Sequence, residues 1–229
     1  MMMELRESNT YSDDIPEPFS KMRFWYHLGY QLPRSLVSAF CGYRVIGQEN
    51  LVDKAPVLYV CNHESYLDPP LIGQAFNHEL DYLARKTLFT GIGKFLYPRF
   101  NAVPIDQANP ELKTLRTMIN RLKNKGQVLI FPEGERTYNG ELGKGQQGVG
   151  MIVAKSWPTV QPMRLFGARE ILPRGKTFIK PHPVRLVIGK PIVWNEAVKQ
   201  AKGKEQYNLI SEQIMQEIGN LSVDGYVCS

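Results

Sequence analysis

A histidine and an aspartate lie five residues apart in residues 62–68, which read NHESYLD and are called the histidine motif here. A carboxylate beside an imidazole fixes the tautomer of the ring and stabilises the imidazolium that forms when the histidine accepts a proton. His63 and Asp68 are therefore candidates for a general base and the group that orients it. Five residues of a continuous α-helix turn about 140° around its axis, so the two side chains can meet only if the chain turns between them.

A second group of polar residues occupies residues 131–137, which read FPEGERT and are called the glutamate motif here. Glu133 and Arg136 lie on either side of Gly134. A guanidinium, together with backbone amides that a glycine leaves accessible, suits a phosphate group or a developing oxyanion. The alternative is that Arg136 pairs with Glu135 in a surface loop and has no chemical role.

A purely structural interpretation of the histidine motif is also open. Asp68 precedes Pro69, and aspartate at the N-cap with proline at the first helical position is a common helix start. In this interpretation Asp68 only caps a helix and His63 only ends a strand. The two interpretations differ for Asp68→Asn, because asparagine caps a helix about as well as aspartate does.

The surrounding sequence alternates between apolar strands and amphipathic helices. Each motif follows a short apolar run, residues 55–61 and residues 127–131, of the kind that forms a strand buried on both faces. The pattern predicts an α/β fold with a mostly parallel sheet flanked by helices, in which strand carboxyl ends carry the site. Further strands are expected at residues 159–166 and 184–188, and helices at residues 69–76, 91–100, 110–125, 149–157 and within 195–219.

Length and composition indicate one globular domain. The 229 residues are 43% hydrophobic and 22% charged, which excludes a disordered or fibrous chain. No run approaches the roughly 18 apolar residues of a membrane span, and the acidic, polar start of the chain does not resemble a secretory signal peptide. The three scattered cysteines predict no disulfide framework and no CxxC metal site, and they fit a reducing cytosol.

Charge divides the chain into an acidic start and a basic remainder. The net charge is +6, and residues 1–20 carry −4, which leaves +10 on the rest. A body this basic favours anionic partners such as nucleic acid, phosphorylated metabolites or an anionic membrane surface. Residues 1–20 are expected to be a disordered acidic tail, and residues 44–229 to form the functional domain.

Residues 21–43 are expected to form two short helices, divided at Pro33. Within residues 21–48 every charged residue is positive, and the others are mainly apolar or aromatic. One interpretation is a helical pair that only packs on the body. The other is a membrane-surface motif that also dips its aromatic edge into a bilayer interface, where basic residues beside Trp and Tyr are favoured. Pro33 and Arg34 argue against a helix that spans the membrane.

The two motifs in this order resemble the glycerolipid acyltransferase family of 1-acylglycerol-3-phosphate acyltransferases. The first and third motifs of that family are N-H-x4-D and F-P-E-G-x-R-S/T, and here they lie about seventy residues apart. The resemblance extends from about residue 42 to residue 192. Residues 85–89 (RKTLF) resemble the lysine-bearing segment of the family, residues 101–107 (NAVPIDQ) its second motif, residues 160–163 (VQPM) its fourth, and residues 172–175 and 188–191 its C-terminal features.

The resemblance implies an enzyme of phospholipid biosynthesis that moves a fatty acyl group from acyl-CoA or acyl carrier protein. The acceptor would be the hydroxyl of a lysophospholipid such as 1-acylglycerol-3-phosphate or a related lysolipid. No metal or bound cofactor is implied, and the protein is expected to be peripheral, on the cytoplasmic face of a membrane. His63 would be the general base, oriented by Asp68, and the substrate-binding residues would be Lys86, Glu133, Gly134 and Arg136.

Two positions depart from the family pattern. The second motif usually ends in arginine, and Gln107 stands there; after the third motif the family commonly has Phe-Lys, and this chain has Gly145-Gln146. Two expected cations near an acceptor phosphate are thus neutral, and each lost contact could weaken binding by about 1.5–3 kcal/mol. The departures predict an acceptor headgroup that is less anionic than a free phosphomonoester.

Other classes of protein fit less well. Residues 143–148 (GKGQQG) match G-x-G-x-x-G, but eleven residues separate them from the expected strand, whereas a dinucleotide fingerprint follows its strand directly. No G-x-S-x-G or H-E-x-x-H occurs. A non-catalytic lipid-binding or transfer protein on the same scaffold is an alternative that thiol release from acyl-CoA would test. A basic nucleic-acid binder lacks a recognisable motif, so no nucleic acid partner is expected.

Overall fold

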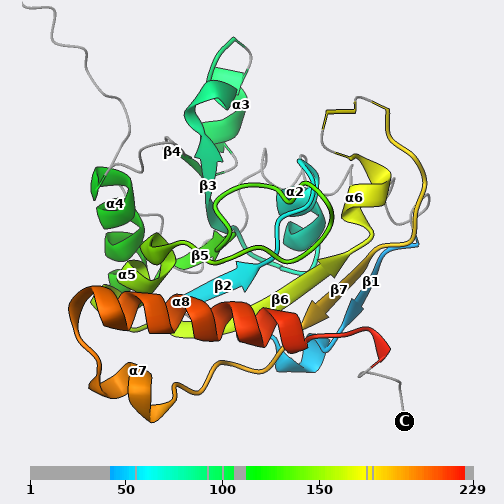
Figure 1. The fold of residues 1–229 in the computed structure, drawn as a ribbon. Helices are drawn as coiled ribbons and strands as arrows, with labels where there is room; N and C mark the ends of the chain where they lie inside the picture. Colours follow the sequence, from blue (N-terminus) through cyan, green and yellow to red (C-terminus); the bar gives the residue numbers. More distant parts are fainter. Residues whose placement is uncertain are drawn as a thin grey trace, which may run out of the picture.

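The computed structural model describes residues 42–54, 56–91, 93–99, 101–105, 112–173, 175–176 and 178–224 (Figure 1). Within them a seven-stranded sheet has the spatial order β1-β7-β6-β2-β5-β3-β4. Its strands are β1 (Arg44–Ile46), β2 (Val57–Cys61), β3 (Asp81–Arg85), β4 (Ala102–Ile105), β5 (Gln127–Ile130), β6 (Thr159–Phe166) and β7 (Arg185–Ile188).

The five strands β6, β2, β5, β3 and β4 run parallel to one another. β7 pairs antiparallel with β6, and β1 pairs parallel with β7. The predicted mostly parallel sheet is therefore confirmed. Because the carboxyl ends of the five parallel strands share one edge, the segments that follow β2 and β5 leave the sheet side by side.

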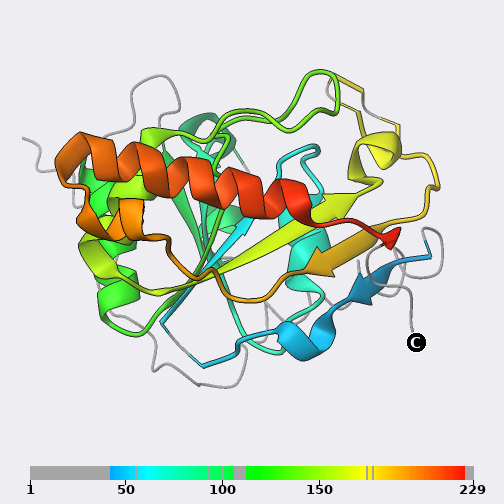
Figure 2. The same cartoon turned by 60° about the horizontal axis from the view of Figure 1, so that its bottom comes forward.

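Helices cover both faces of the sheet. They are α2 (Asp68–Gly73), α3 (Gly93–Arg99), α4 (Leu112–Lys123), α5 (Gln147–Ser156), α6 (Ala168–Ile171), α7 (Glu196–Gln200) and α8 (Gly203–Asn220), with single 3₁₀ turns η1 (Gln48–Asn50) and η2 (Lys86–Leu88). In Figures 1 and 2, α8 lies across the strands beside α5.

Alternation along β2 explains how one strand serves two cores. Every residue of β2 is buried, and successive side chains point to opposite faces. Tyr59 belongs to the core that α2 and α6 cover. Leu58 and Val60 belong to the core that α4, α5 and α8 cover. Helices α5 and α8 of the second core approach closely at Gly150 of α5. A Cβ at this position would lie 1.9 Å from the carbonyl oxygen of Tyr207 on α8.

The expected elements at residues 55–61, 127–131, 159–166 and 184–188 are strands, as predicted. The expected helices also form, and two separate helices, α7 and α8, occupy the stretch predicted at residues 195–219, with α8 ending one residue later. Three short strands and α6 were not predicted. One of them is β1, which directly follows the predicted helical pair of residues 21–43 and is defined by its pairing with β7.

The predicted acidic tail of residues 1–20 lies outside the described residues, and so do residues 21–41 of the predicted helical pair. Both stay predictions. Among the residues that the structure describes, no helix combines the length and apolar character that crossing a membrane requires.

Candidate functional site

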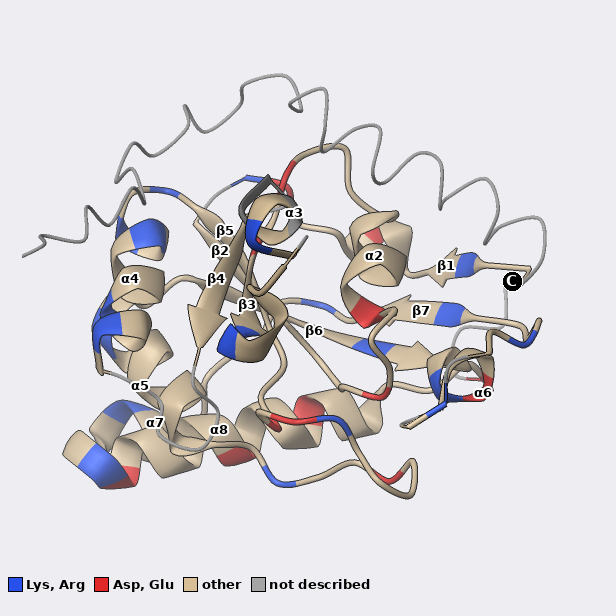
Figure 3. Cartoon of the chain, turned by 90° about the horizontal axis from the view of Figure 1, so that it is seen from above, with Lys and Arg blue, Asp and Glu red and all other residues tan. Residues whose placement is uncertain are grey.

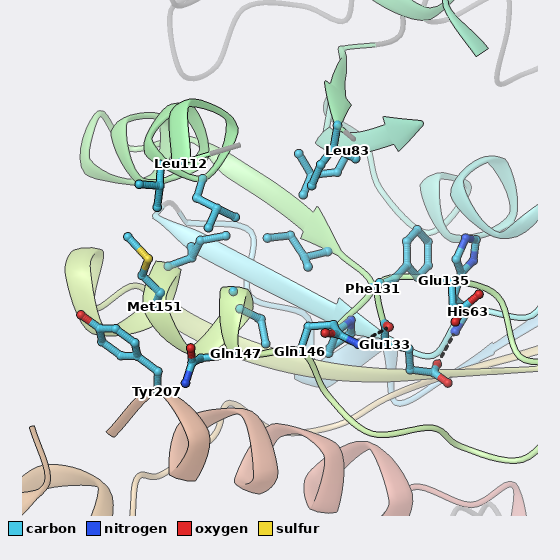
Figure 4. Close-up of a pocket in the computed structure, with 18 of the residues that line it drawn as sticks. His63, Leu83, Leu112, Phe131, Glu133, Glu135, Gln146, Gln147, Met151 and Tyr207 are labelled. Atoms are coloured by element: carbon cyan, nitrogen blue, oxygen red, sulfur yellow. Dashed lines mark hydrogen bonds between the residues drawn. The ribbon is translucent and has the colours of Figure 1, made fainter. Parts of the chain in front are cut away.

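The histidine and glutamate motifs meet at the carboxyl edge of the sheet (Figure 4). β2 and β5 are parallel neighbours in which Val60 pairs with Ile130, so the two motifs begin at the same level. The amide of His63 donates to Oε1 of Glu133 over 2.8 Å, and the amide of Thr137 donates to the carbonyl oxygen of His63 over 2.8 Å. Contacts in both directions therefore lock the two motifs together.

His63 and Asp68 form the pair that the sequence predicted. The chain turns between them, with the amide of Asp68 donating to the carbonyl oxygen of Ser65, and Nδ1 of His63 lies 2.7 Å from Oδ2 of Asp68. The same Oδ2 accepts the amides of Glu64 (2.6 Å) and Ser65 (2.9 Å). Because this oxygen acts as an acceptor, we assign the proton of the imidazole to Nδ1, which leaves a lone pair on Nε2.

The prediction that Asp68 serves as an N-cap is wrong. Asp68 is the first residue of α2, the capping position is Leu67, and no side-chain cap bond forms. The carboxylate of a cap would have to accept hydrogen bonds from amides in the first turn, but Pro69 and Pro70 have no N–H to donate, and the amide of Leu71 donates to the carbonyl oxygen of Leu67. The carboxylate, which is fully buried, turns back to His63 and to the loop before the helix.

The imidazole of His63 is also held by Phe131. The two rings are stacked, with centroids 4.1 Å apart and planes 17° apart. The side chain of His63 stays 16% exposed. The ring is thus fixed by Asp68 on one nitrogen and by Phe131 on one face, and it remains accessible from the adjoining cavity.

Glu133 braces the loops of the site. Its Oε1 accepts the amide of His63, and its Oε2 accepts the amide of Gly143 over 2.8 Å. Burial is the main reason that the pKa of this carboxyl group is raised, although the two amides oppose the shift. These contacts account for a structural role, and a direct role of Glu133 in binding substrate stays a prediction.

Gly134 and Arg136 lie where the glutamate motif turns away from the sheet. Gly134 has a φ of 74°, a left-handed conformation that favours glycine, and its amide donates to the carbonyl oxygen of Phe131. The guanidinium carbon of Arg136 lies 3.5 Å from the centroid of the Tyr66 ring, and the residue is 9% exposed. Arg136 is therefore stacked on the histidine motif, close to the pair of His63 and Asp68.

An elongated cavity of about 740 Å³ begins at His63 and Glu133 and extends between β3, α4, α5 and α8. In Figure 4 His63 lies at one end of the cavity lining, with Leu112, Met151 and Tyr207 at the other. Gln147, Lys204 and Tyr207 also line the cavity, and most of the other lining residues away from His63 are apolar. The apolar lining consists of Leu83, Ile105, Leu112, Leu115, Ile130, Phe131, Val149, Met151 and Ile152.

Lys86, the predicted substrate-binding lysine, is exposed at the start of η2 and does not line this cavity. Its neighbour Arg85 does line the cavity, as does Leu83. The two alternate along β3 on the face opposite the buried Tyr82. A period-two pattern in this strand could have indicated Arg85, but the strand itself was not predicted.

Glu64 is a half-buried acidic group of the site that the sequence did not single out. Its Oε1 accepts from Nδ2 of Asn62 over 3.2 Å. Burial raises the pKa of Glu64 to about 7, with the nearby Asp68 and Glu170 adding to the shift and the backbone amide of Arg169 opposing it. A carboxyl group that changes protonation near neutral pH thus lies next to the His63–Asp68 pair.

The glycines of residues 143–148 permit close approach of a loop to the site. A Cβ at Gly143 would lie 2.9 Å from Oε2 of Glu133, and one at Gly145 would lie 2.3 Å from Oγ of Ser211. Gln146 donates its amide to the carbonyl oxygen of Pro132 and lines the cavity. Gln107, the other departure from the family pattern, lies outside the described residues. Among the described residues no cluster of three or more His, Cys, Asp or Glu could hold a metal ion.

Comparisons with known proteins agree with this geometry. Residues 42–165 match the family model described as Acyltransferase. The chain is 31% identical to a chloroplastic 1-acyl-sn-glycerol-3-phosphate acyltransferase of Brassica napus over 72% of this chain and 51% of that protein. It is 30% identical to a chloroplastic enzyme of the same name in Arabidopsis thaliana, over 76% of this chain and 51% of that protein. The chain thus spans about half the length of these two relatives.

A bacterial relative and a solved structure cover more of their own length. The chain is 28% identical to the 1-acyl-sn-glycerol-3-phosphate acyltransferase of Bacillus subtilis, over 79% of this chain and 88% of that protein. It superposes on the crystal structure of the 1-acyl-sn-glycerophosphate acyltransferase PlsC from Thermotoga maritima with a TM-score of 0.64 and 25% identity. That match covers 83% of this chain and 77% of the other.

Proposed function

Because the chain belongs to the Acyltransferase family, we propose that it transfers a fatty acyl group from a thioester donor to a hydroxyl of a lysophospholipid. The observation that carries the proposal is the contact of 2.7 Å between Nδ1 of His63 and Asp68, at the end of a largely apolar cavity. A base, a site for an acyl chain and two interlocked loops are the parts that such a reaction needs.

In this mechanism Nε2 of His63 removes the proton from the acceptor hydroxyl. The hydroxyl oxygen forms a bond to the thioester carbonyl carbon, and the tetrahedral intermediate then breaks its C–S bond. The imidazolium of His63 then donates this proton to the departing thiolate. Asp68 stabilises that imidazolium through Nδ1, and a positioned base of this kind contributes roughly 10²–10⁴-fold to the rate.

The cavity is proposed to hold an acyl chain. Its volume of about 740 Å³ is within the range of roughly 300–1,000 Å³ for small-molecule sites. The apolar lining would favour a hydrocarbon chain, since burial of each methylene group contributes about 0.8 kcal/mol. The polar end at His63 would leave the thioester or the acceptor hydroxyl beside the base.

We take 1-acylglycerol-3-phosphate as the acceptor. The names of the relatives favour it, and Arg136 at the site and Arg85 at the cavity wall could pair with a phosphate. The prediction of a less anionic headgroup, made from Gln107 and Gln146, competes with this choice. Acyl-CoA and acyl carrier protein both stay open as donors.

Peripheral attachment to the cytoplasmic face of a membrane through residues 21–43 is a further part of the proposal. It rests on the aromatic and basic residues of that segment. Flotation with anionic liposomes should capture the full chain, and replacement of Phe24 and Trp25 by serine should reduce the captured fraction. Equal capture of both proteins would contradict attachment through this segment.

The proposed function is tested by a panel of acceptors with one labelled acyl group supplied on CoA or on acyl carrier protein. Thiol release and product mass are measured for lysophosphatidic acid and for lysophospholipids with larger headgroups. We expect thiol release that depends on lysophosphatidic acid, with phosphatidic acid as the product. Binding of donor without thiol release for any acceptor would favour the non-catalytic lipid-binding alternative. A preference for a larger headgroup would support the prediction from Gln107 and Gln146.

A further inference from the structure

The connection between α6 and β7 exposes two consecutive apolar side chains. Phe178 is 83% exposed and Ile179 is 64% exposed. The other described positions between residues 175 and 183 are exposed as well. Single apolar side chains are common on protein surfaces, whereas two adjacent large ones that are both exposed on a loop indicate a surface that contacts an apolar partner.

The base of this loop is fixed, and it is fixed next to the histidine motif. The amide of Lys180 donates to the carbonyl oxygen of Ile171 over 2.9 Å, and this hydrogen bond joins the beginning of the loop to its later part. Oγ of Ser65 donates to the carbonyl oxygen of Leu172 over 3.0 Å. Since Ser65 is two residues from His63, the loop projects from the immediate surroundings of the proposed base.

The register of the sheet places the loop on the same edge as the site. Phe166, the last residue of β6, pairs with Arg185, the first residue of β7. The intervening chain therefore lies beyond the carboxyl end of β6, the edge at which His63 follows β2. Figure 1 shows this segment extending past α6, and Figure 3 shows Lys and Arg positions around α6.

The charge of the loop has one sign. Residues 172–183 read LPRGKTFIKPHP, with three cations and no acidic residue; the nearest acidic residue in sequence is Glu170 on α6. An exposed apolar pair between cations fits the interface of an anionic bilayer, where apolar side chains enter the headgroup region and each nearby Lys or Arg strengthens attraction to acidic lipids.

We propose that the connection between α6 and β7 is a membrane-contact loop, in which Phe178 and Ile179 enter an anionic lipid surface while Lys176 and Lys180 contact its headgroups. The proposal is separate from attachment through residues 21–43, and it rests on the proposed lipid acceptor for its biological purpose. Contact at this loop would turn the His63 edge of the sheet towards the surface that holds the acceptor.

A second loop provides a matched control. Val193 is 84% exposed, and Lys190 is also exposed, in the connection from β7 to α7. That connection runs back beside β6, with the amide of Ile192 donating to the carbonyl oxygen of Val160. Val193 therefore lies at the amino-terminal edge of the parallel strands, opposite the proposed contact loop.

Insertion is tested with full-length Phe178→Trp and Val193→Trp, compared with the wild type and its three native tryptophans. Vesicles contain phosphatidylglycerol and phospholipids with brominated acyl chains, which quench the fluorescence of tryptophans that enter the bilayer. We expect the tryptophan added by Phe178→Trp to contribute strongly quenched fluorescence. The tryptophan added by Val193→Trp should contribute fluorescence that is not quenched. Quenching that is the same for both variants would overturn the proposal, whether or not residues 21–43 attach the chain.

Affinity is tested by the partition of the variants over a series of vesicle concentrations. Phe178→Ser should weaken partition roughly tenfold and Val193→Ser should leave it unchanged. Lys176→Glu with Lys180→Glu should weaken it on anionic vesicles alone, whereas Lys190→Glu should have little effect. Unchanged partition of both loop variants would overturn the proposal. Partition is measured without turnover, so a failure of the proposed acyl transfer would appear separately, as absent thiol release.

Discussion

The two ends of the cavity are built in different ways. At the His63 end the carboxylates of Asp68 and Glu133 accept backbone amides from the loops around them, at distances of 2.6–2.9 Å. At the far end Leu112, Met151 and Tyr207 surround the space with side chains from three separate helices. The His63 end holds its side chains in fixed orientations, and the far end provides apolar space.

This difference separates two kinds of sensitivity. Proton transfer and attack on a carbonyl depend on geometry at the level of a hydrogen bond, so the His63 end should tolerate almost no change. Hydrocarbon binding depends on the space available and has no preferred direction, so the far end should tolerate substitution and respond in chain-length preference. The predictions below test this contrast, from the largest expected effect to the smallest.

Removal of the base should have the largest effect. His63→Ala should lower kcat by about 10³-fold or more, because it removes the group that accepts the proton from the acceptor hydroxyl. Glu212→Ala, at an exposed position of α8 that does not line the cavity, is the control and should leave kcat unchanged. Thiol release and thermal unfolding are measured on both variants. A folded His63→Ala protein with half of the wild-type activity would contradict the proposed mechanism.

Impaired orientation should cost less than removal of the base. Asp68→Asn should lower kcat by about 10²-fold, because the imidazole remains while the acceptor that holds Nδ1–H is weakened. Steady-state kinetics together with urea unfolding test this expectation: near-wild-type kcat in a folded Asp68→Asn protein would contradict an orienting role for Asp68.

A substitution at the far end should alter the preference for acyl-chain length and leave the chemical step unchanged. Met151→Trp adds volume to the wall of the cavity and should lower kcat/KM for long-chain donors about tenfold, with little effect on short-chain donors. Lys155→Trp, at an exposed position of the same helix, is the control. If long and short donors lost activity by the same factor, the far end would not be the site of the acyl chain.

The smallest effect concerns Glu64 and the pH dependence of stability. Because its pKa is raised from 4.5 to about 7, the folded protein binds a proton there that the unfolded chain has lost. The stabilisation that proton binding to Glu64 contributes is fully present below pH 4.5 and is lost as the pH rises through about 7. Between pH 5 and pH 8 it should lower the free energy of unfolding of the wild type by about 1–3 kcal/mol.

Glu64→Gln should lack this decrease, as measured by urea unfolding at the two pH values. Glu212→Gln, at an exposed position of α8, should keep it. The same pH dependence in Glu64→Gln and the wild type would show that the decrease comes from another group.

Much of the His63 end could be predicted from the sequence. β2 and β5 are continuous apolar runs because both of their faces are buried, and each is followed directly by its motif. The meeting of His63 and Asp68 required a turn, which the sequence allowed and the structure contains. The role of Glu133 as a brace depends on amides from two loops, and residue spacing does not reveal such contacts.

The far end could not be predicted in the same way. Its wall includes β3 and β4, short strands that were missed because sheet pairing and not local pattern defines them. Pro104 within β4 argues against a central strand, and β4 is an edge strand, where the missing amide is tolerated. Arg85 was overlooked beside Lys86 for the same reason. The cavity itself arises from segments between residues 63 and 207 that pack together only in the folded chain.

The central claim is that His63 and Asp68 act as one unit, with Asp68 contributing only through the imidazole. A double-mutant cycle on kcat tests it most directly, with His63→Ala, Asp68→Asn and the double variant measured on the same donor and acceptor. We predict that Asp68→Asn lowers kcat about 10²-fold in the wild type and has no further effect once His63 is alanine. Equal factors in both backgrounds would contradict the account, because Asp68 would then contribute independently of His63.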